Sequence, residues 1–481
     1  MRHDLDSATA LPQNGAAIFL HSDEKMKKSG AAAVSPVRPS AVALTPLLLF
    51  LLLFFGAGVY FTSHGEAMGF YQLRAPVAVL PALALGAWLA WRRGVAPLDT
   101  MLAGMGHPNV MLMCLVFLLA GAFATVTKAV GAVDAVVALG LGALPAALIL
   151  PGLFLVAGFI SLAIGTSMGT IAAVVPVALG VSDAAGLDAG LVLGAVVGGA
   201  MFGDNLSVIS DTTIAATRSQ GCRMHDKFRE NLKMALPAAA VTLAMLAVMG
   251  DVAPVQAPDD PVSRWLVLPY LLVLGLALAG VNVVLVLAIG LVVAGVLGAV
   301  AGAGYDAVSF AGDIYLGFEG MVEITLLALL IGGLAALIKA CGGLDWLAQT
   351  IARFARGHKG RRAGEASIAA LAAGSDALTA NNTVAILISG SLAKDIADHH
   401  GISGRRSASL LDVFSCVMQG VLPYGAQILL AGSLAGLSPL LIAGRVYYCW
   451  LLAVAAIAFM LWPTRRRDAA AGLGRAGSRI E

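Results

Sequence analysis

Residues 203–213 place acidic and hydroxyl side chains inside a sequence that is otherwise almost entirely apolar. The segment reads GDNLSVISDTT, and its two carboxylates are Asp204 and Asp211. The flanking runs 187–202 and 234–249 are apolar enough for lipid, so we expect the polar segment at membrane depth. An ionisable side chain at the centre of a bilayer costs roughly 2.5 to 3.5 kcal/mol, so two of them predict a cavity or an ion path.

Oxygen atoms around these carboxylates could form a site for a small cation. If the segment is one continuous helix, Asp204, Ser207 and Asp211 lie on the same face. A proton and a sodium ion would compete there, because either one removes a charge that the bilayer disfavours. We predict Asp204 and Asp211 as the exchanging pair that holds sodium. The neutral ligands are predicted to be Ser207, Ser210 and Thr212.

Two alternatives stay open for this segment. Asn205 either ligates the ion or braces a break in the chain. Both aspartates could instead only cap helix ends at a cytoplasmic mouth, because Asp is a preferred residue at helix starts.

The composition indicates a membrane protein with several spans. Of the 481 residues, 59% are hydrophobic and 12% are charged, which is typical of a chain that crosses a bilayer repeatedly. The five cysteines lack metal-binding spacing, so neither a disulfide framework nor a metal centre is expected. The polar segments hold no nucleophile with a base and no phosphate-binding loop, so no enzyme is predicted. The expected partners are the lipid bilayer and small cations or a small-molecule substrate, and not nucleic acid.

Apolar runs and charged loops predict the topology. The runs of about 20 residues that could cross a bilayer are 41–62, 75–91, 109–127, 234–249, 265–281, 282–302, 321–339 and 439–462. The basic segments, expected in the cytoplasm, are 92–93, 218–233, 353–362 and 465–467. Acidic segments 251–260 and 306–319 are expected outside. Both termini are then cytoplasmic, with residues 1–40 and 463–481 as tails and the first tail disordered.

An internal repeat divides the chain into two parts. Residues 121–134 align with 332–345 at an offset of 211, and farther on Asp204 aligns with Asp412 and Ser207 with Ser415 at an offset of 208. Because equivalent loops fall on opposite sides, we predict inverted repeats over 41–252 and 253–462. Each repeat is expected to be all-α, with about five transmembrane helices and one re-entrant hairpin.

Polar residues interrupt the apolar sequence at four places, two in each repeat. They lie at 165–170, 203–213, 374–383 and 412–427, and the repeat would bring them together at the membrane midplane. The substrate path is predicted to include Gly165, Thr166, Ser167, Thr170, Ser375, Asp376, Asn381, Asn382, Thr383, Asp412 and Ser415. Asp376 could instead pair with backbone amides at a hairpin tip, and Asn381 and Asn382 are also typical of turns.

These four motifs resemble those of a known family. GTSMGT (165–170), GDNLSVISDTT (203–213), GSDALTANNT (374–383) and LLDVFSCVMQGVLPYGAQ (410–427) are similar to motifs of NhaC-type sodium/proton antiporters in the ion transporter superfamily. The resemblance covers most of residues 41–462. It implies inverted repeats with re-entrant hairpins, commonly in a homodimer, and cation-coupled antiport in a cell inner (plasma) membrane.

The first hypothesis is therefore exchange of Na⁺ for H⁺, with no cofactor beyond these transported ions. Members of the family also carry organic solutes, so the second hypothesis is Na⁺- or H⁺-coupled antiport of a small organic acid or amino acid. No Lys or Arg falls inside the four polar segments, which favours a bare cation. A passive channel is a further alternative, which flux without obligatory exchange would reveal.

Overall fold

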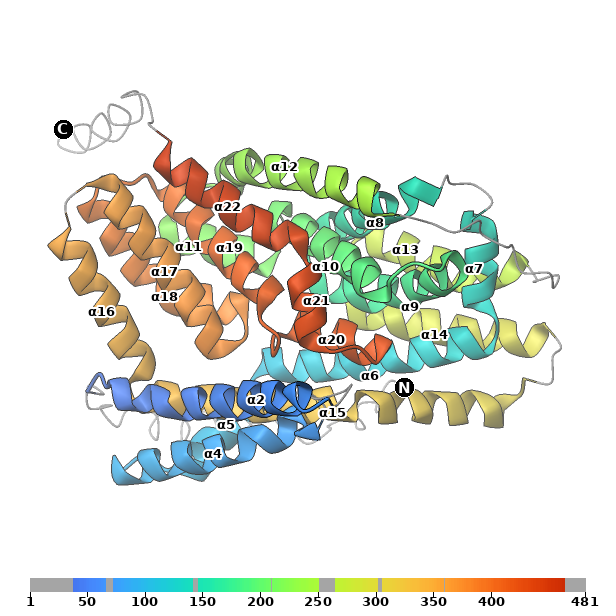
Figure 1. Cartoon of the computed structure of the whole chain (residues 1–481), viewed down its shortest axis with the longest axis horizontal. Helices are drawn as coiled ribbons and strands as arrows, with labels where there is room; N and C mark the ends of the chain where they lie inside the picture. The colour runs from blue at the N-terminus through green and yellow to red at the C-terminus, as the bar shows by residue number, and fades with distance from the viewer. Residues whose placement is uncertain are drawn as a thin grey trace, which may run out of the picture. The chain divides into compact units, whose positions relative to one another are not determined.

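The computed structural model describes residues 38–65, 72–141, 146–208, 210–250, 264–301, 305–358 and 360–462. These residues form helices joined by short turns, with no strand in the described ranges (Figure 1). Nine helices of this part of the chain are long and apolar enough to cross a membrane, or ten if one bent pair is a single span. Because helices satisfy their own backbone hydrogen bonds, they suit a bilayer. The prediction of an all-α polytopic membrane protein is confirmed.

The described helices follow one another in two series. The first comprises α2 (Thr45–Ser63), α4 (Ala75–Arg92), α5 (Pro97–Met105), α6 (Pro108–Ala129), α7 (Ala132–Leu141), α8 (Ile149–Ile164), α9 (Ser167–Ala185), α10 (Ala189–Leu206), α11 (Asp211–Gln220) and α12 (Met224–Met249). The second comprises α13 (Leu268–Leu278), α14 (Val283–Val300), α15 (Ala307–Ala340), α16 (Gly343–Gly357), α17 (Arg361–Thr379), α18 (Asn382–His399), α19 (Gly404–Val421), α20 (Ala426–Ala435), α21 (Pro439–Arg445) and α22 (Tyr447–Leu461).

Several predicted spans have different limits in the structure. Helix α12 begins ten residues before the predicted span 234–249, inside the segment predicted as a basic loop. Helix α15 starts at Ala307, so most of the predicted outer loop 306–319 is helical. The last run is bent by 49° between α21 and α22. An apolar run marks only the lipid-compatible part of a helix, and charged residues at its ends extend it beyond that part.

Two helical hairpins and two broken helices carry the polar segments. Helices α8 and α9 meet at Gly165, and α17 and α18 meet at Ala380, both in the left-handed backbone region, with φ of 78° and 48°. Glycine adopts this region freely, whereas alanine does so at a cost. Helix α10 ends at Leu206 and α11 begins at Asp211, so the condition under which Asp204, Ser207 and Asp211 would share one helical face is not met. The predicted break in this span is confirmed.

The two series correspond over these elements at one constant separation. The start of α9, the two ends of α10 and the two ends of α11, at 167, 189, 206, 211 and 220, recur 215 residues later at 382, 404, 421, 426 and 435. In this register Asp204 corresponds to Gln419, so the predicted alignment of Asp204 with Asp412 at 208 is wrong. Helices α6 and α15 end 211 residues apart, at 129 and 340, as the earlier alignment predicted. The inverted orientation of the two repeats stays a prediction.

Helix α10 packs against α8 at very close range, and glycine makes this possible. A Cβ atom added to Gly203 would overlap the carbonyl oxygen of Gly158 and the backbone nitrogen of Leu162. Small residues allow membrane helices to approach until their backbones touch. This contact fixes the end of α10, and with it the position of Asp204.

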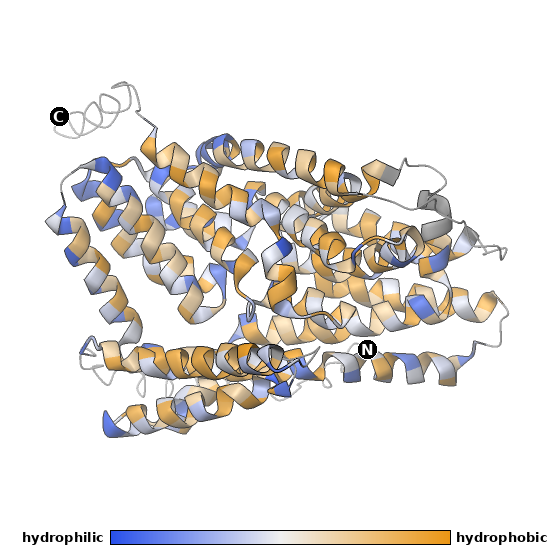
Figure 2. Ribbon diagram, in the orientation of Figure 1, coloured by the Kyte–Doolittle hydropathy of each residue, from blue (hydrophilic) through white to orange (hydrophobic). Residues whose placement is uncertain are grey.

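Charged residues gather at helix ends. Figure 2 shows apolar colours along most helices and hydrophilic residues toward the ends of α12, α17 and α18. Arg406 lies on α19 and is 2% exposed. It pairs with Glu365 at 3.1 Å and with Glu230 at 3.6 Å, and its guanidinium lies 4.1 Å from the ring centre of Phe459. This cluster joins α12, α17, α19 and α22.

Candidate functional site

The carboxylate of Asp204 is buried near the end of α10, where it is 6% exposed. Its Oδ2 accepts hydrogen bonds from Ser167 Oγ at 2.8 Å and from the Ser167 backbone N–H at 3.3 Å. Its Oδ1 accepts one from Ser210 Oγ at 2.6 Å. Ser167 is the first residue of α9, so the positive end of that helix faces the carboxylate. These bonds stabilise the anion and leave carboxylate lone pairs for a proton or a cation.

Hydroxyl groups hold the break between α10 and α11 open. Ser207 and Ser210 have extended backbones, and Ser210 precedes the first residue of α11. Thr213 Oγ1 donates to the carbonyl oxygen of Ser207 at 2.6 Å, and Ser207 Oγ donates to that of Leu162 at 3.1 Å. A broken span leaves backbone groups unpaired, and serine and threonine side chains pair them. The local sequence, rich in Ser and Thr, therefore explains why the chain can break here.

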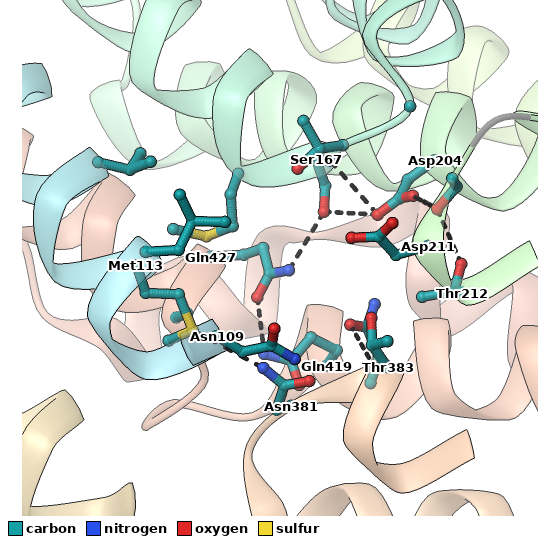
Figure 3. A pocket seen from close by; sticks show the side chains of 18 of the residues that line it. Asn109, Met113, Ser167, Asp204, Asp211, Thr212, Asn381, Thr383, Gln419 and Gln427 are labelled. Carbon is teal, nitrogen blue, oxygen red and sulfur yellow. Dashed lines mark hydrogen bonds between the residues drawn. The ribbon is translucent and has the colours of Figure 1, made fainter. Parts of the chain in front are cut away.

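A cavity of about 110 Å³ lies beside Asp204. This is enough room for several water molecules or a partly hydrated cation. Figure 3 shows Ser167, Asp204, Asp211 and Thr212 along one side, and Asn109, Asn381 and Gln419 facing them. Among the described residues that line the cavity there are two carboxylates and no Lys, Arg or His. The lining thus favours a positively charged occupant.

A chain of side-chain hydrogen bonds links Asp204 to the second series of helices (Figure 3). Gln419 Nε2 donates to Gln427 Oε1 at 2.7 Å, and Gln427 Nε2 donates to Ser167 Oγ at 3.1 Å. Ser167 Oγ in turn donates to Asp204 Oδ2. We call this series the glutamine relay. Every donor in it points toward Asp204, so the relay stabilises that carboxylate in its charged form.

Lys227 forms a second polar cluster next to this site. It lies on α12 and is 1% exposed, so the prediction that it belongs to a cytoplasmic basic loop is wrong. Its Nζ lies 2.7 Å from Asp412 Oδ2 and donates to Thr213 Oγ1 at 2.7 Å and to the Asn205 carbonyl oxygen at 3.1 Å. Asp412 Oδ2 also accepts from Asn205 Nδ2 at 3.1 Å and from Asn231 Nδ2 at 2.8 Å. The positive charge of Lys227 therefore balances Asp412 internally.

Asp376 differs from the other two buried aspartates. It lies near the end of α17 with 0% exposure, and neither carboxylate oxygen has a hydrogen-bond partner. The alternative prediction, that it pairs with backbone amides at the hairpin tip, is therefore wrong. Ser375 beside it accepts a hydrogen bond from Ser389 Oγ at 2.8 Å. A buried carboxyl group without a partner is far less costly when protonated.

The structure brings together most but not all of the predicted site residues. Those that line the cavity are Gly165, Thr166, Ser167, Asp204, Ser210, Asp211, Thr212, Asn381, Asn382 and Thr383. Asp211 is exposed, in contrast to Asp204. The predicted residues outside its lining are Thr170, Asn205, Ser207, Ser375, Asp376, Asp412 and Ser415. Asn205 braces the break by binding Asp412, which is one of the two roles left open for it.

Sequence reasoning missed Asn109 and Lys227, and it included Gln427 in the polar segment 412–427 without assigning it a role. Asn109 lies at the start of an apolar run and lines the cavity, and Gln427 follows the proline and glycine after α19. Lys227 is separated from the four polar segments along the chain. An unusual polar residue beside an apolar run could have indicated Asn109 and Gln427, whereas nothing in the spacing points to Lys227. The described residues contain no group of three or more His, Cys, Asp or Glu that could hold a metal ion.

Known proteins are similar to this chain over a range that includes two of the polar segments, 165–170 and 203–213. Residues 98–250 match the Na⁺/H⁺ antiporter family. The Na⁺/H⁺ antiporter NhaC of Bacillus subtilis is 29% identical over 155 residues, covering 29% of this chain and 34% of that relative. The Na⁺/H⁺ antiporter NhaC of Alkalihalophilus pseudofirmus is 23% identical over 298 residues, covering 55% and 63%. The chain thus spans about a third of the length of the first relative and less than two thirds of the second.

A relative named for a different transport activity matches over a longer range. The arginine/ornithine antiporter ArcD of Halobacterium salinarum is 24% identical over 411 residues, which cover 77% of this chain and 83% of that relative. The matched family segment contains Asp204, the break that holds it and Lys227. These matches, which include the motifs at 165–170 and 203–213, show that residues 98–250 are similar to the Na⁺/H⁺ antiporter family.

Proposed function

We propose that this protein exchanges sodium ions for protons across a membrane through the carboxylate of Asp204. The observation that supports this most is the setting of that carboxylate. It is buried at the break of a membrane span, faces the start of α9 and lies beside a cavity without a basic residue in its described lining. Asp211 is the second acidic group of the same cavity.

The exchange follows from the cost of an empty charged site. A buried carboxylate is unfavourable while it is charged and unoccupied, because little water reaches it. A proton removes the charge, and a sodium ion at the carboxylate oxygens balances it, so each occupant excludes the other. The hydroxyl oxygens of Ser210 and Thr212, which lie 2.9 Å apart, supply neutral ligands next to the carboxylate. Only the two occupied forms change orientation readily, which couples the two ion flows.

The change of orientation is proposed to involve both repeats. The cavity is lined from α6, α9, α10 and α11 of the first series and from α14, α18, α19, α20 and the turn before α18 of the second. In secondary transporters with inverted repeats, one bundle of helices moves against another around a site at the midplane. We propose the same here, in an inner (plasma) membrane with both termini in the cytoplasm. Transport and not catalysis is the proposed activity, and a homodimer stays an implication of the family resemblance.

A second candidate is antiport of a small amino acid or organic acid, and one feature of the cavity favours it. Opposite the two carboxylates, carboxamide groups from Asn109, Asn382 and Gln427 line the same space. An ammonium group could bind at Asp204 and Asp211 while carboxamide N–H groups hold a carboxylate. The long match to an arginine/ornithine antiporter supports keeping this candidate.

The test uses purified protein in liposomes that contain a pH-sensitive dye. An outward sodium gradient should drive proton uptake by the wild type, and Asp204→Asn should lower the initial rate at least tenfold. Asp183→Asn, at an exposed aspartate of α9, is the matched control and should keep the rate. Robust exchange of radiolabelled arginine or malate without sodium-driven proton movement would favour the second candidate. An unchanged rate in Asp204→Asn would remove that residue from the mechanism.

A further inference from the structure

The second repeat carries a neutral residue at the position that Asp204 occupies in the first. Asp204 lies two residues before the end of α10, and Gln419 lies two residues before the end of α19, 215 residues later. The neighbouring elements keep the same separation, because Ser167 and Asn382 are the first residues of α9 and α18. Two matching breaks therefore face one cavity, one with a carboxylate and one with a carboxamide.

The orientation of the Gln419 carboxamide is fixed by its neighbours. Its Nε2 donates to Gln427 Oε1 at 2.7 Å and to the carbonyl oxygen of Ala380 at 3.3 Å. Both partners are acceptors, so a flipped carboxamide would place oxygen against oxygen. Gln419 Oε1 is then left buried with no hydrogen-bond partner, although the residue lines the cavity. A buried carbonyl oxygen without a partner calls for an explanation.

A carboxylate at this position would change the charge of the cavity. The acidic groups that line it, Asp204 and Asp211, both belong to the first repeat. The second repeat contributes carboxamides, namely Asn381, Asn382, Gln419 and Gln427. At residue 419 a glutamate would lie at the same place on its helix as Asp204, with the start of α18 in the place of α9. The acceptor oxygens that Gln419 Nε2 now meets would favour the protonated form of that glutamate, whereas the donors around Asp204 favour its charged form, so sodium would have a second proton to displace.

We infer that Gln419 limits the number of cations that the cavity exchanges, because its neutral side chain removes the second of two equivalent carboxylate positions. This inference rests on the proposed sodium/proton exchange at Asp204. Gln419 also sets the direction of the glutamine relay. Its N–H group turns Gln427 so that the Gln427 N–H faces Ser167, which leaves the Ser167 hydroxyl hydrogen for Asp204. With Gln419 neutral, the hydrogen bonds of the glutamine relay therefore stabilise only the carboxylate of Asp204.

The experiment counts the protons that sodium displaces from each protein molecule. Purified protein in detergent, in weak buffer with a pH dye, is titrated with NaCl to saturation at a pH where the wild type releases protons. Gln419→Glu should release one more proton per chain than the wild type, and Asp204→Asn one fewer. The double variant, with both changes, should release the same number as the wild type. Gln419→Asn, which keeps a carboxamide, is the matched control and should leave the number unchanged.

The outcomes separate this inference from the proposed function. If sodium releases no proton from the wild type, the proposed exchange fails and the inference fails with it. If the wild type releases protons and Gln419→Glu releases the same number, only the inference is overturned. A purely structural role of Gln419 would lower the melting temperature without changing the count. Should Gln419→Glu fail to fold, the shorter Gln419→Asp, which also places a carboxyl group there, decides, since a count equal to that of the wild type would refute the inference.

Discussion

Replacing Lys227 by methionine should destabilise the fold strongly, because it leaves a buried charge without its partner. Methionine keeps the length and apolar stem of lysine but removes the ammonium group. Asp412, which is 1% exposed, would then keep only the hydrogen bonds from Asn205 and Asn231. Breaking a buried ion pair by removing one partner typically costs about 3 to 5 kcal/mol. With both side chains at most 2% exposed, we expect Lys227→Met to fall in this range.

The double variant shows whether the pair causes the loss. Lys227→Met with Asp412→Asn removes both charges and keeps the shape of the acidic residue, so most of the lost stability should return. Unfolding in mixed micelles with increasing denaturant, followed by tryptophan fluorescence, would measure all four proteins. We expect an interaction energy of at least about 2 kcal/mol between the two sites, within the range found for residues in direct contact. A double variant that loses the sum of both single losses would refute this account of the pair.

Three further predictions follow from contacts described above. Gly203→Ala should lower the melting temperature, because the new methyl group meets the backbone of α8 at Gly158, while Gly152→Ala, whose new methyl group would meet no atom within 4 Å, should be tolerated. Arg406→Met should cost about 2 kcal/mol, because Glu365 loses its buried partner and keeps only its pair with Arg361 at 2.8 Å, and a change of under about 0.5 kcal/mol in denaturant titration would contradict the pairing. Burial raises the pKa of the Cys222 thiol to about 11, so maleimide labelling at pH 7 should be roughly 100-fold slower than for a free thiol and should accelerate with each pH unit up to about 11. Labelling kinetics with Cys222→Ser as the blank would check this, and a rate that levels off near pH 8.5 would refute it.

Much of the site could be predicted from the sequence because its polar residues stand out against lipid-compatible surroundings. The segment 203–213, the hairpin at 165–170 and the asparagines near 381 were all predicted, and they meet at one cavity. An ionisable residue inside a membrane span is costly and is therefore usually functional, so such residues can be recognised in a single sequence. The sequence also predicts a break within 203–213, and the structure has it after Leu206.

The remaining features depend on which residues meet in space. Lys227 looks like one charge of a basic loop, since hydropathy cannot show that an ammonium group is balanced by Asp412 across the fold. The alignment of Asp204 with Asp412 failed for a related reason. Both aspartates are acidic and are followed by serine three residues later, yet the helix ends place Gln419 at the equivalent position. Matching residue types align the two repeats at an offset of 208, whereas the helix ends align them at an offset of 215.

Asn205 ties the break to two other helices and so limits how the protein can move. Its carbonyl oxygen is bound by Lys227 and Asn231 of α12, and its side chain is bound to Asp412 of α19. Asp204, the preceding residue, cannot shift far without stretching these bonds. The end of α10 should therefore travel as one rigid body with the adjoining parts of α12 and α19. The hinges of any alternating motion are then to be sought outside that body.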